Sequence, residues 1–361
     1  MRQPRELTAF SYDDQRQLRY DDSSMSYYYL PVEEVAGADL SQGFDRFVQR
    51  VETDEHLDGL LLALIEHERA HGRTPANMIT WRGLMTKLLC LPYARNDSFE
   101  LNAVYFDGQL FIEEDAAFKR QAQRPLDDRG RMMTYWGYKF EALATLPGTW
   151  HETPRAVIEG RRAATVSNIP QYCSVVKTGV GEVRMLLAGE VDAVWDYKPD
   201  NSDVHDGDDE HVRIEYDSPL DHYAELKTNR TIGSDRDATA FESKLLKVWA
   251  QSFLLGVPRV VVGFRTDQGF LQTTEEFETQ KIPSMVKKSK FYVPGTTWDG
   301  QDAISFFAAA VDWLRESIPD DGDVYKIRYM PRSDFLEIAR TDTASFLHPD
   351  FVAWRRSQGQ L

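Results

Sequence analysis

The feature that most constrains this chain is an apolar run from Met185 to Trp195 that contains two acids, Glu190 and Asp192. Apolar sequence of this length is typical of a β-strand that is covered on both faces. Side chains two positions apart in a strand share a face and lie about 6.6 Å apart at roughly 3.3 Å per residue. The two carboxylates are therefore expected to point the same way in a buried setting, where like charges cost free energy unless a cation compensates them. A divalent cation is the simplest compensation.

A second motif, Glu225-Leu226-Lys227, places a carboxylate and an ammonium on one face of another predicted strand. Hard oxygen ligands bind Mg²⁺ or Mn²⁺, and the bound cation polarises a phosphoryl oxygen and lowers the pKa of a water. A lysine beside it can orient that water or neutralise developing charge, so an acid followed by Glu-x-Lys is typical of metal-dependent nucleases. An ion pair between Glu225 and Lys227 on a solvated sheet face is the alternative that these residues alone leave open.

Composition limits the classes of function that this chain can have. The 361 residues, of which 42% are hydrophobic, suffice for one large α/β domain or two ordinary ones. A formal net charge of −16 argues against a broad basic surface that coats duplex nucleic acid, whereas a narrow basic pocket is compatible with it. The sequence contains no run of eighteen apolar residues, so we expect no transmembrane helix and no membrane partner. The two cysteines, Cys90 and Cys173, are too few for a disulfide framework.

The whole sequence predicts a mixed α/β fold, with twisted mixed β-sheets flanked by helices, because strands alternate with amphipathic helical stretches. Helices are expected over residues 57–70, 84–89, 239–255 and 303–318, and strands over 78–82, 101–113 (a hairpin), 173–178, 183–195, 222–228, 259–265 and 269–274. Residues 132–146 fit a strand or a helix, the first fifty residues fit an arm packed across the domain, and the sequence after residue 318 reads as irregular.

The chain shows no repeat and no linker, so we expect a single domain over residues 1–361. Much of its acidity lies in residues 200–221, which carry nine carboxylates and one arginine. Such a charge run is typical of a solvated loop. We therefore interpret residues 200–221 as an acidic insertion between the two motif strands.

Six short motifs follow one another along the chain. They are Thr80-Trp81-Arg82-Gly83, Gly137-Tyr138-Lys139-Phe140-Glu141, Glu190-Val191-Asp192, Glu225-Leu226-Lys227, Lys247-Val248-Trp249-Ala250-Gln251-Ser252-Phe253 and Gly263-Phe264-Arg265. In this set and order, the sequence resembles the decapping exoribonuclease (DXO) family over residues 10–283. The sequence around the motifs looks closer to the fungal nuclear branch, whose members accompany the nuclear 5′→3′ exoribonuclease, than to the stand-alone animal enzymes.

The resemblance implies a PD-(D/E)xK nuclease-like core and hydrolysis at RNA 5′ ends. Members of the family remove pyrophosphate from 5′-triphosphate RNA, release incomplete or NAD-type caps, and in some cases degrade RNA in the 5′→3′ direction. All of these reactions attack the phosphorus of the first nucleotide and differ in the leaving group. We therefore expect an RNA 5′-pyrophosphohydrolase and decapping hydrolase, with Mg²⁺ or Mn²⁺ as its cofactor, that serves mRNA 5′-end quality control.

The resemblance also assigns roles by position. Acidic side chains would bind the divalent cation together with one backbone carbonyl, and these ligands are Glu141, Asp192, Glu225 and the carbonyl of Leu226. Glu190 would hold a metal-bound water or a second cation. The remaining positions would contact the substrate or the nucleophile, and they are Lys227, Gln251, Arg82, Trp81 and Cys173. As sequence alone, Cys173 is only a small buried residue, and Gln251 belongs to the polar stripe of a helix, where a solvated face is the usual interpretation.

Two further expectations concern partners. The resemblance implies that the protein acts on RNA 5′ ends in the nucleus, together with a nuclear 5′→3′ exoribonuclease. The alternative is a non-catalytic protein that stabilises that exoribonuclease through an acidic surface. A restriction-type DNA endonuclease is a weaker reading, because the net charge and the lack of a DNA-reading motif oppose it.

Overall fold

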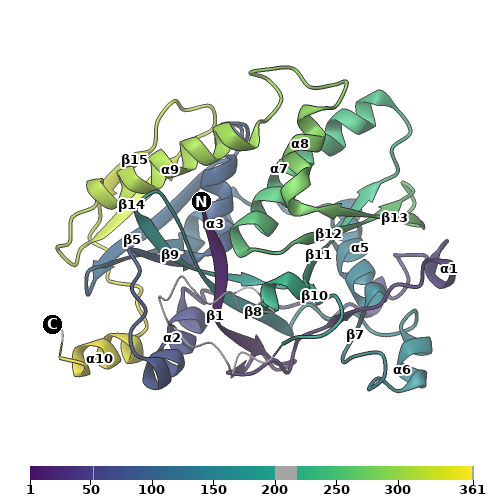
Figure 1. The fold of residues 1–361 in the computed structure, drawn as a ribbon, viewed down its shortest axis with the longest axis horizontal. Helices are drawn as coiled ribbons and strands as arrows, with labels where there is room; N and C mark the ends of the chain where they lie inside the picture. The colour runs from purple at the N-terminus through teal and green to yellow at the C-terminus, as the bar shows by residue number, and fades with distance from the viewer. Residues whose placement is uncertain (52, 200–217, 360–361) are drawn as a thin grey trace, which may run out of the picture.

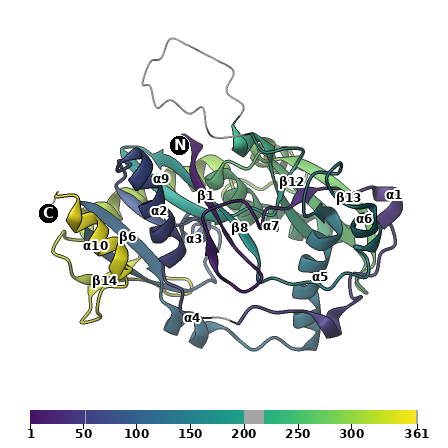
Figure 2. The same ribbon diagram turned by 90° about the horizontal axis from the view of Figure 1, so that it is seen from below.

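A computed structural model describes residues 1–51, 53–199 and 218–359. The described chain is built on two mixed β-sheets with helices packed on their faces (Figures 1 and 2). This arrangement confirms the predicted mixed α/β class. Apart from residues 218–221, the predicted acidic insertion lies outside the described residues.

The larger sheet has the strand order β15-β14-β5-β6-β4-β9-β8-β1-β2. Its strands are β1 (Arg2–Tyr12), β2 (Leu18–Arg19), β4 (Met78–Trp81), β5 (Phe99–Phe106), β6 (Gln109–Glu114), β8 (Gln171–Val180), β9 (Val183–Glu190), β14 (Val324–Tyr329) and β15 (Glu337–Arg340). The strand β4 runs parallel to both of its neighbours, β6 and β9. Its side chains from Met78 to Thr80 are buried, as expected of a central strand covered on both faces.

The smaller sheet has the strand order β13-β12-β11-β10-β3-β7. Its strands are β3 (Tyr27–Tyr28), β7 (Thr145–Leu146), β10 (Ala193–Val194), β11 (Tyr223–Arg230), β12 (Arg259–Arg265) and β13 (Leu271–Glu278). The strands β11 and β12 run parallel, and β12 and β13 form a hairpin. The strand β10 is short and pairs with β11 only at Ala224 and Tyr223.

Helices cover both sheets (Figure 1). They are α1 (Val32–Val35), α2 (Asp58–His71), α3 (Arg82–Cys90), α4 (Ala116–Ala122), α5 (Asp128–Ala144), α6 (Arg155–Gly160), α7 (Asp235–Leu255), α8 (Ile282–Lys287), α9 (Gly300–Ser317) and α10 (Pro349–Ser357), with short 3₁₀ turns at Phe44–Arg46, Pro219–His222 and Thr279–Lys281. The largest apolar cluster joins α3, α7 and α9 to strands of both sheets. On the opposite faces, α2 and α10 cover the larger sheet and α5 covers the smaller one. Among the described helices, none has the length and apolar character needed to cross a membrane.

Both ends of the chain are more regular than the sequence suggests. The first residues form the strand β1, which pairs antiparallel with β8, rather than an arm. Most of β1 is exposed or half-buried and only its end from Phe10 to Tyr12 is buried, so the alternation that marks a strand is weak. The expectation of irregular sequence after residue 318 is also wrong, because β14 and β15 extend the larger sheet and α10 follows them.

The structure also settles the secondary structure of two interior segments. Residues up to Ala144 of the ambiguous segment belong to α5, and the buried side chains of this helix include Tyr135, Trp136, Phe140 and Leu143, which repeat with helical spacing. The strand β4 ends at Trp81 and α3 begins at Arg82, so Gly83 lies inside a helix rather than at a strand end.

Candidate active site

The chain crosses from one sheet to the other between the two acids of the first motif. The strand β9 ends at Glu190 in the larger sheet, and β10 begins at Ala193 in the smaller sheet. The amide of Val191 donates to the carbonyl of Tyr172 at 3.0 Å, and the side chain of Val191 is buried at the junction. The prediction of one continuous strand over residues 183–195 is therefore wrong. Glu190 and Asp192 do not share a strand face, because Glu190 is the last residue of β9 and Asp192 lies between the two strands.

Asp192 reaches the edge of β11 that β10 leaves open. Within the described chain, β10 covers β11 only as far as Ala224, so the edge from Leu226 onward has no neighbouring strand. There the Oδ2 of Asp192 accepts a hydrogen bond from the amide of Leu226 at 2.8 Å. The carboxylate thus takes the place that a further strand residue would occupy, and it holds the crossing against β11.

The ammonium of Lys227 lies at the centre of the predicted ligands. Its Nζ donates to the carbonyl of Leu226 at 3.0 Å and to Asp192 Oδ2 at 3.2 Å. It also lies 2.6 Å from Glu225 Oε1, and Glu225 is buried. Three oxygens from three residues therefore converge on one positive charge.

Glu141 approaches from α5, which packs against β11. The helix lies close to the sheet because Gly263 of β12 has no side chain: an added Cβ there would lie 2.6 Å from the ring of Phe140. Phe140 directly precedes Glu141, so this close approach sets the position of the carboxylate. Burial and then the negative charge of Asp192 raise the pKa of Glu141 well above its usual value.

The other groups form one electrostatic cluster. Burial and then the charge of Glu225 raise the pKa of Asp192. Burial alone would raise the pKa of Glu225, but the charges of Lys227 and Arg82 outweigh it and lower that pKa. The loss of solvent around the Glu190 carboxylate, and then the negative charge of Asp192, raise the pKa of Glu190 to about 7. Since the Glu190 side chain is exposed, it lies where solvent can enter a region otherwise enclosed by protein.

The donor set suits a hard divalent cation, because it consists of carboxylate and carbonyl oxygens. Among the residues that the structure describes, no three His, Cys, Asp or Glu side chains are grouped closely enough to hold a metal ion as they stand. The Lys227 ammonium occupies the point where the oxygens of Asp192, Glu225 and Leu226 meet. These oxygens could hold a divalent cation when the ammonium turns away from them.

The guanidinium of Arg82 is a second positive group close to Glu190 and Glu225. Its Nη2 donates to the backbone carbonyl of Glu190 at 3.1 Å, and its Nη1 lies 4.0 Å from Glu225 Oε2. That Nη1 is buried and has no hydrogen-bond partner among the described residues. A buried donor without a partner is costly, so this guanidinium is available for an anionic group in the site.

Comparison with known proteins identifies the family. A family model described as RAI1 like PD-(D/E)XK nuclease matches residues 2–352. The chain belongs to this family. The Decapping nuclease RAI1 of Aspergillus fumigatus is 42% identical, and the match covers 98% of this chain and 94% of that relative. The predictions of a DXO-type family, a PD-(D/E)xK nuclease-like core and a hydrolase of the nuclease class are confirmed.

Two solved structures of the family resemble this fold closely. One is Candida albicans Rai1 in complex with pU5-Mn2+, with a TM-score of 0.89 and 34% identity over 99% of this chain and 96% of that chain. The other is Scheffersomyces stipitis Rai1 in complex with (3'-NADP)+ and calcium ion, with a TM-score of 0.86 and 36% identity over 99% of this chain and 97% of that chain. The RAI1-like fold is thus matched over nearly its full length.

In this RAI1-like chain, Gln251 lies on the helix face that is directed toward the site. It shares that face of α7 with Leu255, four residues later, and with Lys244, seven residues earlier. Leu255 packs so closely on Gly189 that an added Cβ would lie 3.0 Å from its side chain, and Lys244 Nζ donates to Asn229 Oδ1 of β11 at 3.0 Å. Gln251 is half-buried and has no side-chain hydrogen bond to the described residues.

The two remaining predicted residues lie around the RAI1-like site. Trp81 ends β4 next to Arg82, and its indole donates to the carbonyl of His56 at 3.3 Å. Cys173 pairs with Glu190 across β8 and β9, but its side chain is buried in an apolar cluster. Burial raises the pKa of its thiol, so the thiolate is disfavoured.

The sequence reasoning missed one side chain that touches the acids. Gln171 of β8 donates from its Nε2 to Glu190 Oε2 at 3.1 Å. Its position two residues before Cys173 puts it on the same strand face, and only the register of β8 against β9 could have indicated this contact.

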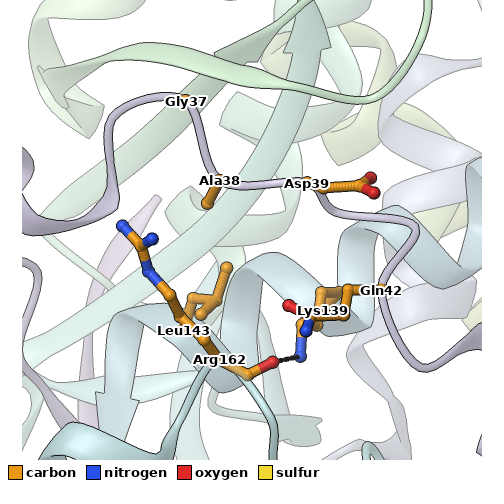
Figure 3. A pocket seen from close by; sticks show the side chains of 7 residues that line it. All are labelled: Gly37, Ala38, Asp39, Gln42, Lys139, Leu143 and Arg162. Carbon is orange, nitrogen blue, oxygen red and sulfur yellow. Dashed lines mark hydrogen bonds between the residues drawn. The ribbon is translucent and has the colours of Figure 1, made fainter.

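A cavity of about 400 Å³ lies elsewhere, beside α5 and the loop around Asp39 (Figure 3). Its lining is formed by Gly37, Ala38, Asp39, Gln42, Lys139, Leu143 and Arg162. There the Nζ of Lys139 donates to the carbonyl of Arg162 at 2.7 Å. Lys139 and Glu141 are two residues apart, which separates them by about 200° around the helix. The cavity therefore does not belong to the acidic cluster of this RAI1-like protein.

Proposed function

We propose that this protein is a divalent-metal-dependent hydrolase of RNA 5′ ends. The observation that carries the proposal is the convergence of Asp192, Glu225 and the Leu226 carbonyl on the ammonium of Lys227 at the open edge of β11, against which α5, the helix of Glu141, packs. Two similar structures support it, since Candida albicans Rai1 was solved in complex with pU5-Mn2+ and Scheffersomyces stipitis Rai1 in complex with (3'-NADP)+ and a calcium ion.

The chain's own residues have separate roles in this proposal. The oxygens of Glu141, Asp192, Glu225 and the carbonyl of Leu226 would hold the cation, and Glu190 would hold a water or a second cation beside them. The bound cation supplies positive charge that polarises the scissile phosphoryl group. Lys227, once released from its carboxylates, can neutralise charge on the phosphate, and Gln251 can orient a water by hydrogen bonds. Arg82 can grip a phosphate with its Nη1, which has no hydrogen-bond partner among the described residues.

One site can serve several 5′ ends. In each, the bond broken joins a leaving group to the phosphorus that becomes the 5′-terminal phosphate of the product RNA, and the leaving group is pyrophosphate, an incomplete cap or an NAD-type cap. The same acids and the same cationic groups apply to each, because only the leaving group changes. The site is therefore compatible with pyrophosphohydrolase and cap-removing activities in one protein, and with 5′→3′ exonuclease action if a monophosphate end is accepted.

We further propose that the protein works in the nucleus beside a 5′→3′ exoribonuclease. The support is the closeness of its motifs to the fungal nuclear branch together with a formal net charge of −16, which suits a basic partner. A purely stabilising role, without catalysis, is the competing proposal. Asp192→Asn separates the two, because it should abolish hydrolysis and leave association with the exoribonuclease intact.

The experiment that tests the main proposal is a panel of RNAs with one preparation of protein. Triphosphate, unmethylated-cap, methylated-cap, NAD-cap and monophosphate RNAs of one sequence are incubated with Mg²⁺, with Mn²⁺, or with a chelator. We expect metal-dependent release of pyrophosphate or of an intact cap, and product lengths separate end removal from progressive degradation. If every RNA is unchanged with both metals, the proposed function is wrong.

A further inference from the structure

We propose that Gln171 is a positioning residue that fixes the carboxylate of Glu190 for hydrolysis, and that Arg16 and Arg50 orient its amide. The proposal rests on the proposed function, because it assigns the support of one acid in that site. Gln171 Nε2 donates to Glu190 Oε2 at 3.1 Å, and among the described residues this is the only side-chain hydrogen bond that Glu190 makes.

The orientation of the Gln171 amide is determined by its neighbours. A glutamine amide has an acceptor oxygen and a donor nitrogen that can exchange places by a flip. Here the Oε1 accepts from Arg16 Nη1 at 2.5 Å and from Arg50 Nη1 at 3.3 Å. Guanidinium groups only donate, so the oxygen must face them and the NH₂ group must face Glu190. The Gln171 amide is therefore held in one orientation, in which its NH₂ group donates to the Glu190 carboxylate.

The two arginines are themselves held in place. Glu55 accepts from Arg16 Nε at 3.0 Å and from Arg16 Nη2 at 2.8 Å, a bidentate pair, and it lies 3.0 Å from Arg50 Nη2. The guanidinium of Arg16 also stacks on the ring of Tyr12 with its central carbon 3.7 Å from the ring centre. A single carboxylate thus organises two guanidinium groups, and the Nη1 of each also donates to the Gln171 oxygen.

This support matters because Glu190 would otherwise be loosely held. Its side chain is exposed, and its backbone lies at the end of β9, where the chain leaves the sheet. An exposed carboxylate on a strand end samples several rotamers in the absence of a partner. The Gln171 amide selects one of them. Residues that orient a reactive carboxylate in this way typically change activity about 10- to 100-fold when they are replaced.

The test compares Gln171→Glu with Gln171→Met. The glutamate keeps the shape and the contacts with Arg16 and Arg50, but it places a second carboxylate against Glu190. We expect its kcat on triphosphate RNA with Mn²⁺ to fall about 10- to 100-fold, with KM within about threefold and a metal-free unfolding temperature no lower than that of the wild type. The methionine removes both polar contacts, and its kcat should fall similarly. A crystal structure of Gln171→Met should show the Glu190 carboxylate turned away or in more than one orientation.

The matched control is Gln17→Glu. Gln17 is exposed, and its Oε1 accepts from Arg19 Nη2 at 2.9 Å, so this change has the same chemistry beside an arginine but no contact with Glu190. Its kcat should equal that of the wild type. Wild-type kcat in Gln171→Glu, or an unmoved Glu190 carboxylate in the Gln171→Met crystal, overturns the positioning role. An inactive wild-type protein instead overturns the proposed function, so the two failures are distinguishable.

Discussion

Lys227 Nζ lies 2.6 Å from Glu225 Oε1, two residues earlier on β11. The ion pair that the sequence leaves open as an alternative therefore exists, but it does not lie on a solvated face, because Glu225 is only 3% exposed. Burial of the carboxylate in such a pair costs free energy unless further groups support it. Here Asp192, Arg82 and the Leu226 carbonyl surround the pair, and the arrangement is typical of a reactive site rather than of a stabilising surface contact.

Replacement of Glu225 by Gln should remove activity without unfolding the protein. The change deletes one anionic oxygen donor, so hydrolysis of triphosphate RNA should fall by at least about 100-fold. Lys227 keeps its contacts with Asp192 and Leu226, so the ammonium is not left alone. Initial rates and thermal unfolding without metal test this expectation. A variant with wild-type rates would show that Glu225 is only a structural ion-pair partner.

Divalent cations should stabilise the folded protein. A cation that binds only the folded state adds about 2.7 kcal/mol to the free energy of unfolding at 100 times its dissociation constant. We expect Mn²⁺ or Mg²⁺ to raise the unfolding temperature of the wild type and a chelator to reverse the rise. Asp192→Asn should abolish most of this effect. Asp128→Asn is the control, because the Asp128 side chain is 94% exposed on α5. An equal response in both variants would contradict a metal site at Asp192.

Gly263→Ala should damage both stability and activity. The added Cβ would lie 2.6 Å from the Phe140 ring, so α5 must move away from β12. Overpacking of this kind costs about 1–3 kcal/mol. Because Glu141 follows Phe140, kcat should fall more than the loss of folded protein explains. Gly160→Ala on α6 is the control, since an added Cβ there meets no atom within 4 Å. Wild-type kcat in Gly263→Ala would separate Glu141 from the reaction.

Arg355→Met should unfold the end of the chain while leaving the chemistry intact. The Arg355 guanidinium is buried and donates to Glu68 at 2.6 and 2.9 Å, and to Asp107 and Gln109 at 2.8 Å each. Loss of one partner of a buried ion pair costs about 3–5 kcal/mol.

The measurements for Arg355→Met are denaturant unfolding and the rate per folded molecule, and the latter should match that of the wild type. Arg356→Met provides the comparison, because Arg356 is exposed on the same helix. If both variants unfold at the same denaturant concentration, the buried network does not anchor α10.

The periodic helices and the motif strands of this fold could be predicted from the sequence. The elements whose bounds depend on residues distant in the chain could not. The helix α7 and the strand β12 follow from local spacing, and the structure has them close to the expected bounds. The end of β9 at Glu190 does not follow from local spacing, because Val191 and Ala193 are as apolar as a continuing strand would be. The chain leaves the sheet there because Ala193 pairs with Ala224 of another sheet, a contact across thirty-one positions.

The candidate site shows the same division. Glu225 and Lys227 share a face because they are two residues apart in β11, which the sequence alone could indicate. The position of Glu141 depends on the close packing of Phe140 on Gly263, which has no side chain. The contact of Gln171 with Glu190 depends on the register of β8 against β9. Such relationships arise only in the folded protein, and the motif resemblance supplied Glu141 where spacing could not.

The open edge of β11 has a consequence for any attempt to reduce this protein in size. The candidate site at that edge draws its acids from the crossing after β9, from α5 and from β11 itself, so elements of both sheets contribute to it. A fragment that contains only one of the two sheets would keep only some of the acids of the candidate site. No minimal half-enzyme is therefore to be expected from this architecture, and splitting the chain at residue 191 should yield two inert pieces that recover function only on reassembly.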